Sequence, residues 1–220
     1  MSDLRRSLLK GMSGIVADLY GEPVPAARTA TLKSADAPVP ARQPALPPFC
    51  KLWKTADETI DWTDILVSPT PTDGLTPPDK WALYHQHAAN VLKGDMTAYL
   101  AVLQSANPME DLMPYVTALD VATVDADVLR VTFVPRQDLL DKDAGQYLCG
   151  MALRIARDLF AALPVLQVDV IAAQAEQSLL TVSFTRSAMN KVRFAFIDPV
   201  DFVEKCGGTH PKEDCPCSAN

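Results

Sequence analysis

The chain has 220 residues, of which 48% are hydrophobic, and 27 Asp and Glu against 20 Lys and Arg give a net charge of -7. This size and composition suit one globular domain with extensions, whereas the negative charge excludes a general nucleic-acid binder, which needs a basic face. The best apolar stretch is broken by Pro164 and Asp169 and is too short for a transmembrane helix, so we expect a soluble, cytoplasmic protein.

Residues 1–20 are expected to form an amphipathic helix, because their apolar residues recur every three or four positions. Such a helix docks on the body or on a protein partner, and peripheral contact with a membrane surface through residues 1–20 is an alternative. The run Arg5-Arg6-Ser7-Leu8-Leu9-Lys10 resembles the twin-arginine export motif, which makes export the alternative to a cytoplasmic location.

Residues 21–78 predict a Pro-rich linker or strap that ends in an aromatic cluster. Seven prolines between Gly21 and Pro48 prevent regular structure and favour an extended chain. The cluster that follows contains Trp53 and Trp62, which we expect to be buried, although a linear binding motif on a tether is the alternative.

Residues 79–206 predict an α+β domain that begins with helices. One helix is expected from Asp79 to Gly94, and a second starts at Asp95, a good N-cap, and runs to Ser105. One or two further helical turns are expected between Met109 and Val116. Alternating strands at 121–124 and 128–134 then predict a hairpin.

A central helix follows, because apolar residues from Leu148 to Leu163 recur at helical spacing until Pro164. We expect Cys149 to be a small buried thiol within it. The opposite face of this helix is expected to be solvated and consists of Gln146, Arg154, Arg157 and Asp158. Three carboxylates before the helix are expected to cap it, namely Asp138, Asp141 and Asp143.

After the helix, alternation over 166–172, 180–185 and 191–197 predicts a three-strand meander, and Pro199 begins a short helix to Lys205. The element order therefore predicts an α+β fold in which a mostly antiparallel sheet, made of the hairpin and the meander, is covered by helices.

The tail, residues 207–220, adjoins a candidate metal site. Cys206, His210, Cys215 and Cys217 offer three thiols and an imidazole, which are ligands that zinc takes tetrahedrally. A tail with incidental thiols and a disulfide or redox role are alternatives. Five cysteines, an odd number, do not form a disulfide framework in a chain of this length.

The run Cys206-Gly-Gly-Thr-His210 resembles a motif of the alanyl-tRNA editing domain, in which the Cys and His help to hold zinc. The match covers five residues and implies that Cys206 and His210 are ligands. That family also has an upstream pair of histidines with three residues between them, whereas this chain has His85 and His87 with one residue between them on a helix. We therefore expect these two histidines to be structural.

No residue is predicted to be catalytic. We expect a non-catalytic protein-binding or assembly subunit that engages a protein partner with its N-terminal helix and Pro-rich arm, and oligomerisation remains open. The alternative is a zinc or iron-sulfur enzyme or redox protein that uses the C-terminal Cys and His cluster.

Overall fold

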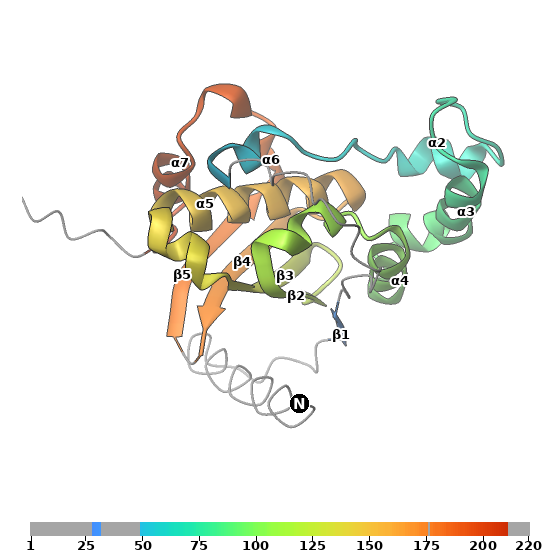
Figure 1. Ribbon diagram of the computed structural model, residues 1–220. Helices are drawn as coiled ribbons and strands as arrows, with labels where there is room; N and C mark the ends of the chain where they lie inside the picture. The colour runs from blue at the N-terminus through green and yellow to red at the C-terminus, as the bar shows by residue number, and fades with distance from the viewer. Residues whose placement is uncertain (1–27, 32–48, 176, 211–220) are drawn as a thin grey trace, which may run out of the picture.

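The computed structural model describes residues 28–31, 49–175 and 177–210. The prediction about residues 1–20 falls outside these ranges. Of residues 21–48 the structure describes only 28–31, which form a short strand, β1 (Arg28–Thr31). The prediction that prolines prevent regular structure is wrong there, because these four residues contain no proline and pair with a neighbouring strand. The fold is α+β, with helices packed on a mostly antiparallel sheet, as predicted (Figure 1).

The sheet consists of two hairpins, which a helix connects along the chain, and one additional edge strand. β2 (Val116–Thr123) pairs antiparallel with β3 (Val128–Pro135), and β4 (Gln167–Gln174) pairs antiparallel with β5 (Gln177–Thr185). The helix between the hairpins carries the chain across the sheet, so β3 and β4 pair in parallel. β1 pairs with β2 at one edge, which gives the order β1-β2-β3-β4-β5.

The connecting helix is α5 (Gln137–Ala162), which is the predicted central helix extended at its N-terminal end. Asp143 interrupts it with non-helical φ and ψ, and its Oδ1 accepts a hydrogen bond from the Gln146 backbone N–H at 2.9 Å. This confirms the predicted capping role of Asp143. Asp138 instead pairs with Arg136, since its Oδ1 lies 2.9 Å from the arginine Nε.

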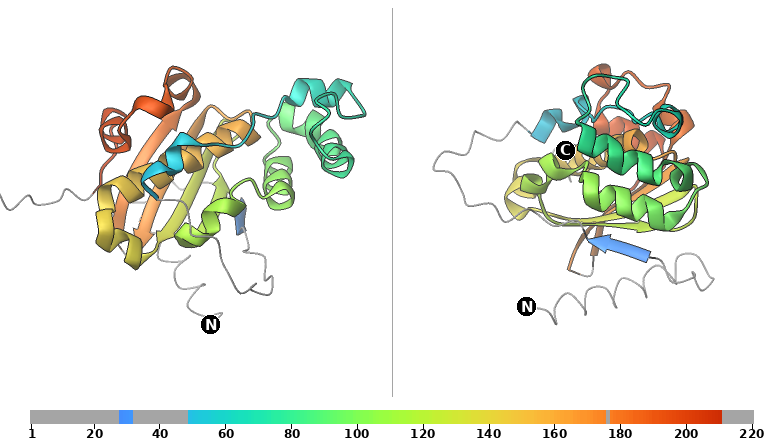
Figure 2. Two further views of the ribbon diagram at one scale, coloured as in Figure 1. Left: turned by 45° about the horizontal axis from the view of Figure 1, so that its top comes forward. Right: turned by 90° about the vertical axis from the view of Figure 1, so that its right-hand side faces the viewer.

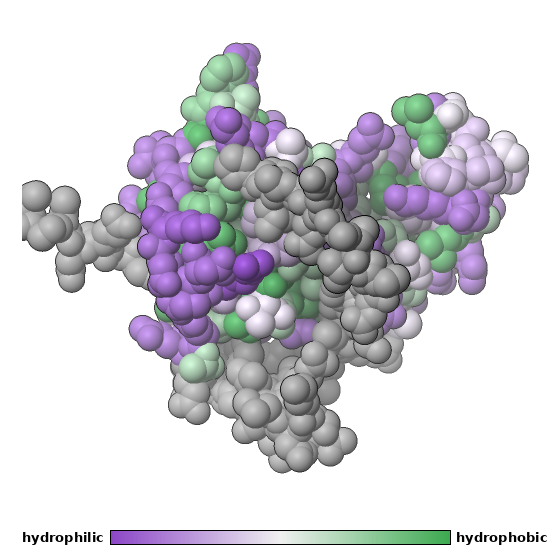
Figure 3. Space-filling model, viewed as in Figure 1, coloured by the Kyte–Doolittle hydropathy of each residue, from purple (hydrophilic) through white to green (hydrophobic). Residues whose placement is uncertain are grey.

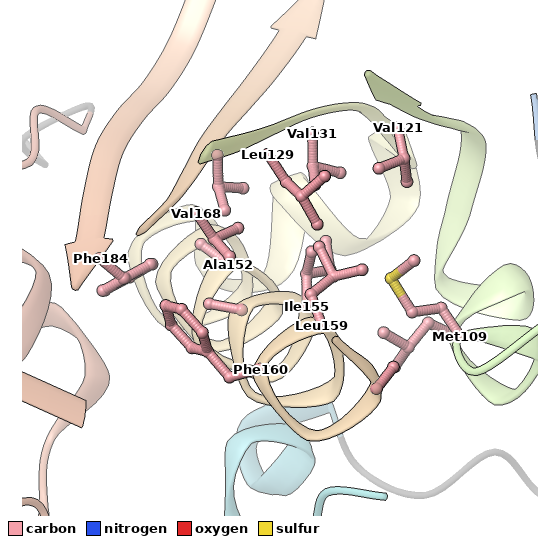
Figure 4. Packing of buried hydrophobic residues seen from close by; sticks show 14 of the residues in the cluster. Met109, Val121, Leu129, Val131, Ala152, Ile155, Leu159, Phe160, Val168 and Phe184 are labelled. Atoms are coloured by element: carbon pink, nitrogen blue, oxygen red, sulfur yellow. The ribbon is translucent and has the colours of Figure 1, made fainter. Parts of the chain in front are cut away.

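The core lies between α5 and one face of the sheet (Figure 4). Alternate strand residues point to this face, including Leu129 and Val131 of β3, while Ile155 and Leu159 approach from α5. All four side chains are fully buried. Each such burial stabilises the fold by about 1.5–3 kcal/mol relative to exposure to water.

Shorter helices surround this core. Trp53 and Trp62 are buried, each about 4% exposed, as predicted. Figure 2 shows the first of these helices, η1 (Phe49–Lys54), lying on the outer side of α5. Asp95 caps α4 (Met96–Ala106) through its side chain, also as predicted. In chain order, the elements between β1 and β2 are η1 (Phe49–Lys54), α2 (Trp62–Val67), α3 (Pro78–Leu92), α4 (Met96–Ala106) and η2 (Glu110–Tyr115).

The predicted third strand of the meander, at 191–197, is wrong. The Thr185 side chain accepts a hydrogen bond from the Ala188 backbone N–H at 3.3 Å, so β5 ends in a capped helical turn, α6 (Arg186–Met189). The chain then leaves the sheet and forms η3 (Phe194–Phe196). α7 (Pro199–Lys205) follows with the predicted bounds.

Candidate functional site: an acidic cleft beside the central helix

The predicted metal ligands are only partly within the described residues. Cys206 ends α7 and is half-buried, and His210 Nε2 lies 3.3 Å from Glu204 Oε1. Cys215 and Cys217 lie outside the described residues. Within residues 28–31, 49–175 and 177–210, no three His, Cys, Asp or Glu side chains are grouped as metal ligands. Zinc binding by the four residues therefore stays a prediction.

The two glycines of the Cys-Gly-Gly-Thr-His run have a structural explanation. Gly207 has φ of +77°, which favours glycine at the end of a helix. A Cβ on Gly208 would lie 2.5 Å from Val203 Cγ1, so only glycine fits there. The next residue, Thr209, then exchanges two backbone hydrogen bonds with Thr181 of β5, at 2.9 and 3.1 Å. The glycines thus let the chain dock on the sheet edge.

Other candidate side chains show no reactive arrangement. His85 and His87 are both half-buried on α3. Cys149 is fully buried, as predicted, and burial raises the pKa of its thiol to about 12, so it stays protonated. Cys50, in contrast, is exposed.

The polar face of α5 is not solvated as predicted, because Arg154 and Asp158 are buried and Gln146 and Arg157 are half-buried. Arg154 is 4% exposed and Asp158 is 0% exposed, because residues 49–61 lie over this face. Arg154 Nε lies 2.7 Å from Asp158 Oδ2, and the Asp57 backbone N–H donates to Asp158 Oδ1 at 3.0 Å. Burial raises the pKa of Asp158 to about 7, while the positive charge of Arg154 opposes the shift.

Arg157 joins two segments on the outer side of α5. Its guanidinium donates to the backbone carbonyls of Trp53 and Thr55, the latter at 3.0 Å. The same guanidinium lies 4.1 Å from the ring centroid of Phe194. One side chain therefore holds both η1 and η3 against α5.

A cleft of about 700 Å³ opens between the C-terminal end of α5, helices α2 and α3, and η2. Figure 1 shows α2 and α3 beside the sheet, joined to the body by the extended stretch after η1. Seven carboxylates line the cleft, against one basic residue, Lys80. The seven are Asp57, Glu58, Asp61, Asp64, Asp73, Glu110 and Asp111.

Hydrogen bonds to the body fix the walls of the cleft. The Ile60 backbone N–H donates to the Ala161 carbonyl at 2.9 Å, and Trp62 Nε1 donates to the Ala162 carbonyl at 2.9 Å. Trp81 Nε1 donates to the Ser68 carbonyl at 2.8 Å, which joins α3 to the end of α2. The cleft is thus anchored at the last turn of α5 by buried aromatic side chains.

Most of the negative charge in the cleft is not compensated by a cation of the described residues. Arg154 Nη2 lies 3.1 Å from Asp111 Oδ2 and 3.7 Å from Asp57 Oδ1 at the base of one wall. Glu58 and Glu110 are exposed, and no ion pair forms between them and a cation in the described parts of the chain. The cleft therefore presents a negative potential concentrated by its concave shape.

The sequence did not reveal this cleft, because its carboxylates come from three separate stretches, at 57–64, at 73 and at 110–111. The only local signal was the density of acidic residues between Asp57 and Asp64, where four of eight residues are Asp or Glu. The lining groups are mainly carboxylates, with three threonine hydroxyls, the Asn107 amide, the Tyr84 hydroxyl and one ammonium, beside apolar side chains. Such a set recognises positive charge.

None of the helices in the described ranges has the length and hydropathy needed to cross a bilayer. The chain matches no family model, no curated protein and no solved structure. Its fold is established as α+β, and the function is inferred from the cleft itself.

Proposed function

We propose that this protein is a non-catalytic protein-binding subunit whose acidic cleft receives a basic segment of a protein partner. The observation that carries the proposal is the excess of seven carboxylates over one lysine in a cleft of about 700 Å³. That volume lies in the range of about 300–1,000 Å³ typical of ligand sites.

The chemistry of the walls supports a peptide rather than a single metal ion. Several carboxylates already accept hydrogen bonds within the fold. Asp61 caps α2, and Asp73 accepts hydrogen bonds from the backbone N–H groups of Leu75 and Thr76. The remaining charges are spread over several elements. Spread charges pair with several cations on one extended segment, which gives specificity and a fast association rate.

The predicted N-terminal arm belongs to the same functional class. Residues 1–48 carry the predicted helix and the Pro-rich strap, and their role in engaging a partner stays a prediction beside the cleft. The two features are compatible, because an extended arm adds binding surface to a site on the folded body.

Fluorescence anisotropy of a labelled octa-arginine peptide tests the proposal. Glu58→Gln combined with Glu110→Gln should weaken binding at least tenfold, since each lost charge pair in a shared site costs about 1 kcal/mol. The matched control is Asp141→Asn combined with Asp201→Asn, which makes the same change in net charge at exposed positions outside the cleft. Equal affinities of the two double variants would refute the proposal.

A further inference from the structure

A second surface, which adjoins the cleft, has the opposite charge. Four exposed cations come from η1 and from the segment that contains η3, two elements that contact each other. We call them the basic patch, and they are Lys51, Lys54, Lys191 and Arg193. Within the described ranges, none of the four forms an ion pair with a carboxylate. The patch is therefore an unneutralised positive surface on a chain of net charge -7.

An exposed aromatic side chain lies in the same segment. Phe196 is 85% exposed, while its neighbour Phe194 is held inward against Arg157. In Figure 3 the projection at the top of the view, which contains η3, shows hydrophobic surface next to polar surface. Large aromatic residues flanked by arginine are the residue types that dominate protein interfaces.

The basic patch and the acidic cleft are joined by one short stretch of chain. The patch includes Lys54 at the end of η1, and the cleft begins at Asp57. η1 lies on the side of α5 that faces away from the sheet (Figure 2), and the cleft opens at the C-terminal end of the same helix, so the two surfaces adjoin. Two adjoining complementary surfaces are what a two-fold dimer requires, since each copy then offers both halves of the contact.

We infer that the basic partner of the cleft is a second copy of this chain. In the two-fold dimer, residues 190–197 of each protomer enter the cleft of the other, with Lys191 and Arg193 facing the carboxylates. Phe196 then loses its exposure to water against the apolar part of the wall, which includes Ile60 and Ala106. This inference rests on the proposed function of the cleft and names its partner.

Charge exchange tests the contact in the full-length protein. The patch variant carries Lys191→Glu and Arg193→Glu, and the cleft variant carries Glu58→Lys and Glu110→Lys. By sedimentation velocity, the wild-type protein should be a dimer and each variant alone a monomer, because the side chains at positions 191 and 193 then carry the same charge as those at positions 58 and 110 in both contacts. An equimolar mixture should restore the dimer, since both contacts of the mixed dimer again join opposite charges.

Salt and Phe196 supply independent measurements. Raising the salt concentration about tenfold should weaken the wild-type dimer at least tenfold, because the contact is largely electrostatic. Phe196→Ser should weaken it about tenfold or more without altering the fold, since the side chain is exposed in the monomer. Phe196→Ser replaces the patch variant if that variant fails to fold.

The outcomes separate this inference from the proposed function. A monomeric wild-type protein that still binds octa-arginine overturns the dimer and leaves the cleft as a binding site for another protein. Dimers that persist in both charge variants, a mixture that stays monomeric, or wild-type assemblies that grow beyond two copies also overturn the inference. A protein that neither dimerises nor binds octa-arginine overturns both.

Discussion

The contact between α5 and η1 depends on the absence of a side chain at Gly150. A Cβ at this position would lie 2.9 Å from Cε3 of Trp53 and 3.3 Å from its Cζ3. The indole has little freedom to move, because Trp53 is 4% exposed and its backbone carbonyl accepts a hydrogen bond from the Arg157 guanidinium. Gly150→Ala therefore forces the helix and η1 apart.

Two opposing effects set the magnitude. Alanine in a helix interior is favoured over glycine by about 1 kcal/mol, while overpacking a core contact costs about 1–3 kcal/mol. We expect Gly150→Ala to lower the free energy of unfolding by about 1 kcal/mol, measured by urea denaturation followed by circular dichroism.

A double-mutant cycle isolates the contact. In a Trp53→Leu background the ring is gone, so Gly150→Ala should become neutral or stabilising by up to about 1 kcal/mol. Among the described residues, the indole Nε1 of Trp53 is buried and has no hydrogen-bond partner, so the change at Trp53 breaks none there. Gly145→Ala is the control on the same helix, since its nearest neighbour would be Val200 Cγ2 at 3.6 Å. Absence of coupling between positions 53 and 150 would refute the reasoning.

Three further predictions concern buried groups. Because the folded-state pKa of Asp158, about 7, lies above its ordinary value of 3.8, the native state binds the extra proton between these values and loses stability as the pH rises through this window. Asp158→Asn should reduce this decline in the free energy of unfolding by roughly 4 kcal/mol. The measurement is urea denaturation of the wild-type protein and the variant at about pH 4 and about pH 8. Parallel pH profiles of the two proteins would contradict the prediction. The buried Cys149 thiol should resist alkylation in the native protein and react after unfolding, so its labelling under native conditions, read by peptide mass spectrometry, would show that the helix opens readily. Gly208→Ala should cost about 1–3 kcal/mol of stability by thermal denaturation, because its Cβ would overlap Val203, whereas Gly207→Asn, at a left-handed position open to solvent, should cost less.

The longer helices and the strands of the two hairpins could be predicted because each has a local signal, whereas β1, η1, α2, α6 and η3 were not predicted. Asp95 and Pro199 mark helix starts through capping and fixed φ, and the switch from helical to alternating spacing after Pro164 separates α5 from β4. These signals depend only on neighbours in sequence, so they can be recognised without the tertiary structure.

The predictions that are wrong, and the cleft that was not predicted, depend on tertiary contacts between residues distant in sequence. Phe194 and Phe196 alternate with Arg193 and Ala195 as in a strand, yet Phe194 packs on Arg157 and Phe196 is exposed, because β5 has already ended at a cap. Arg154 and Asp158 look solvated on a helical wheel, and only the stretch that crosses α5 buries them. The cleft combines three distant stretches, which no local pattern brings together.

The parallel pairing of β3 with β4 has a consequence for how the chain folds. Each hairpin closes over a short turn, an event of about 1–10 μs, whereas the β3–β4 ladder requires the whole of α5 to form and dock first. Until it docks, the apolar faces of both hairpins stay open to water and to other chains. Docking of α5 is therefore the step expected to limit the folding rate, and the interval before it is when the chain is most exposed to aggregation.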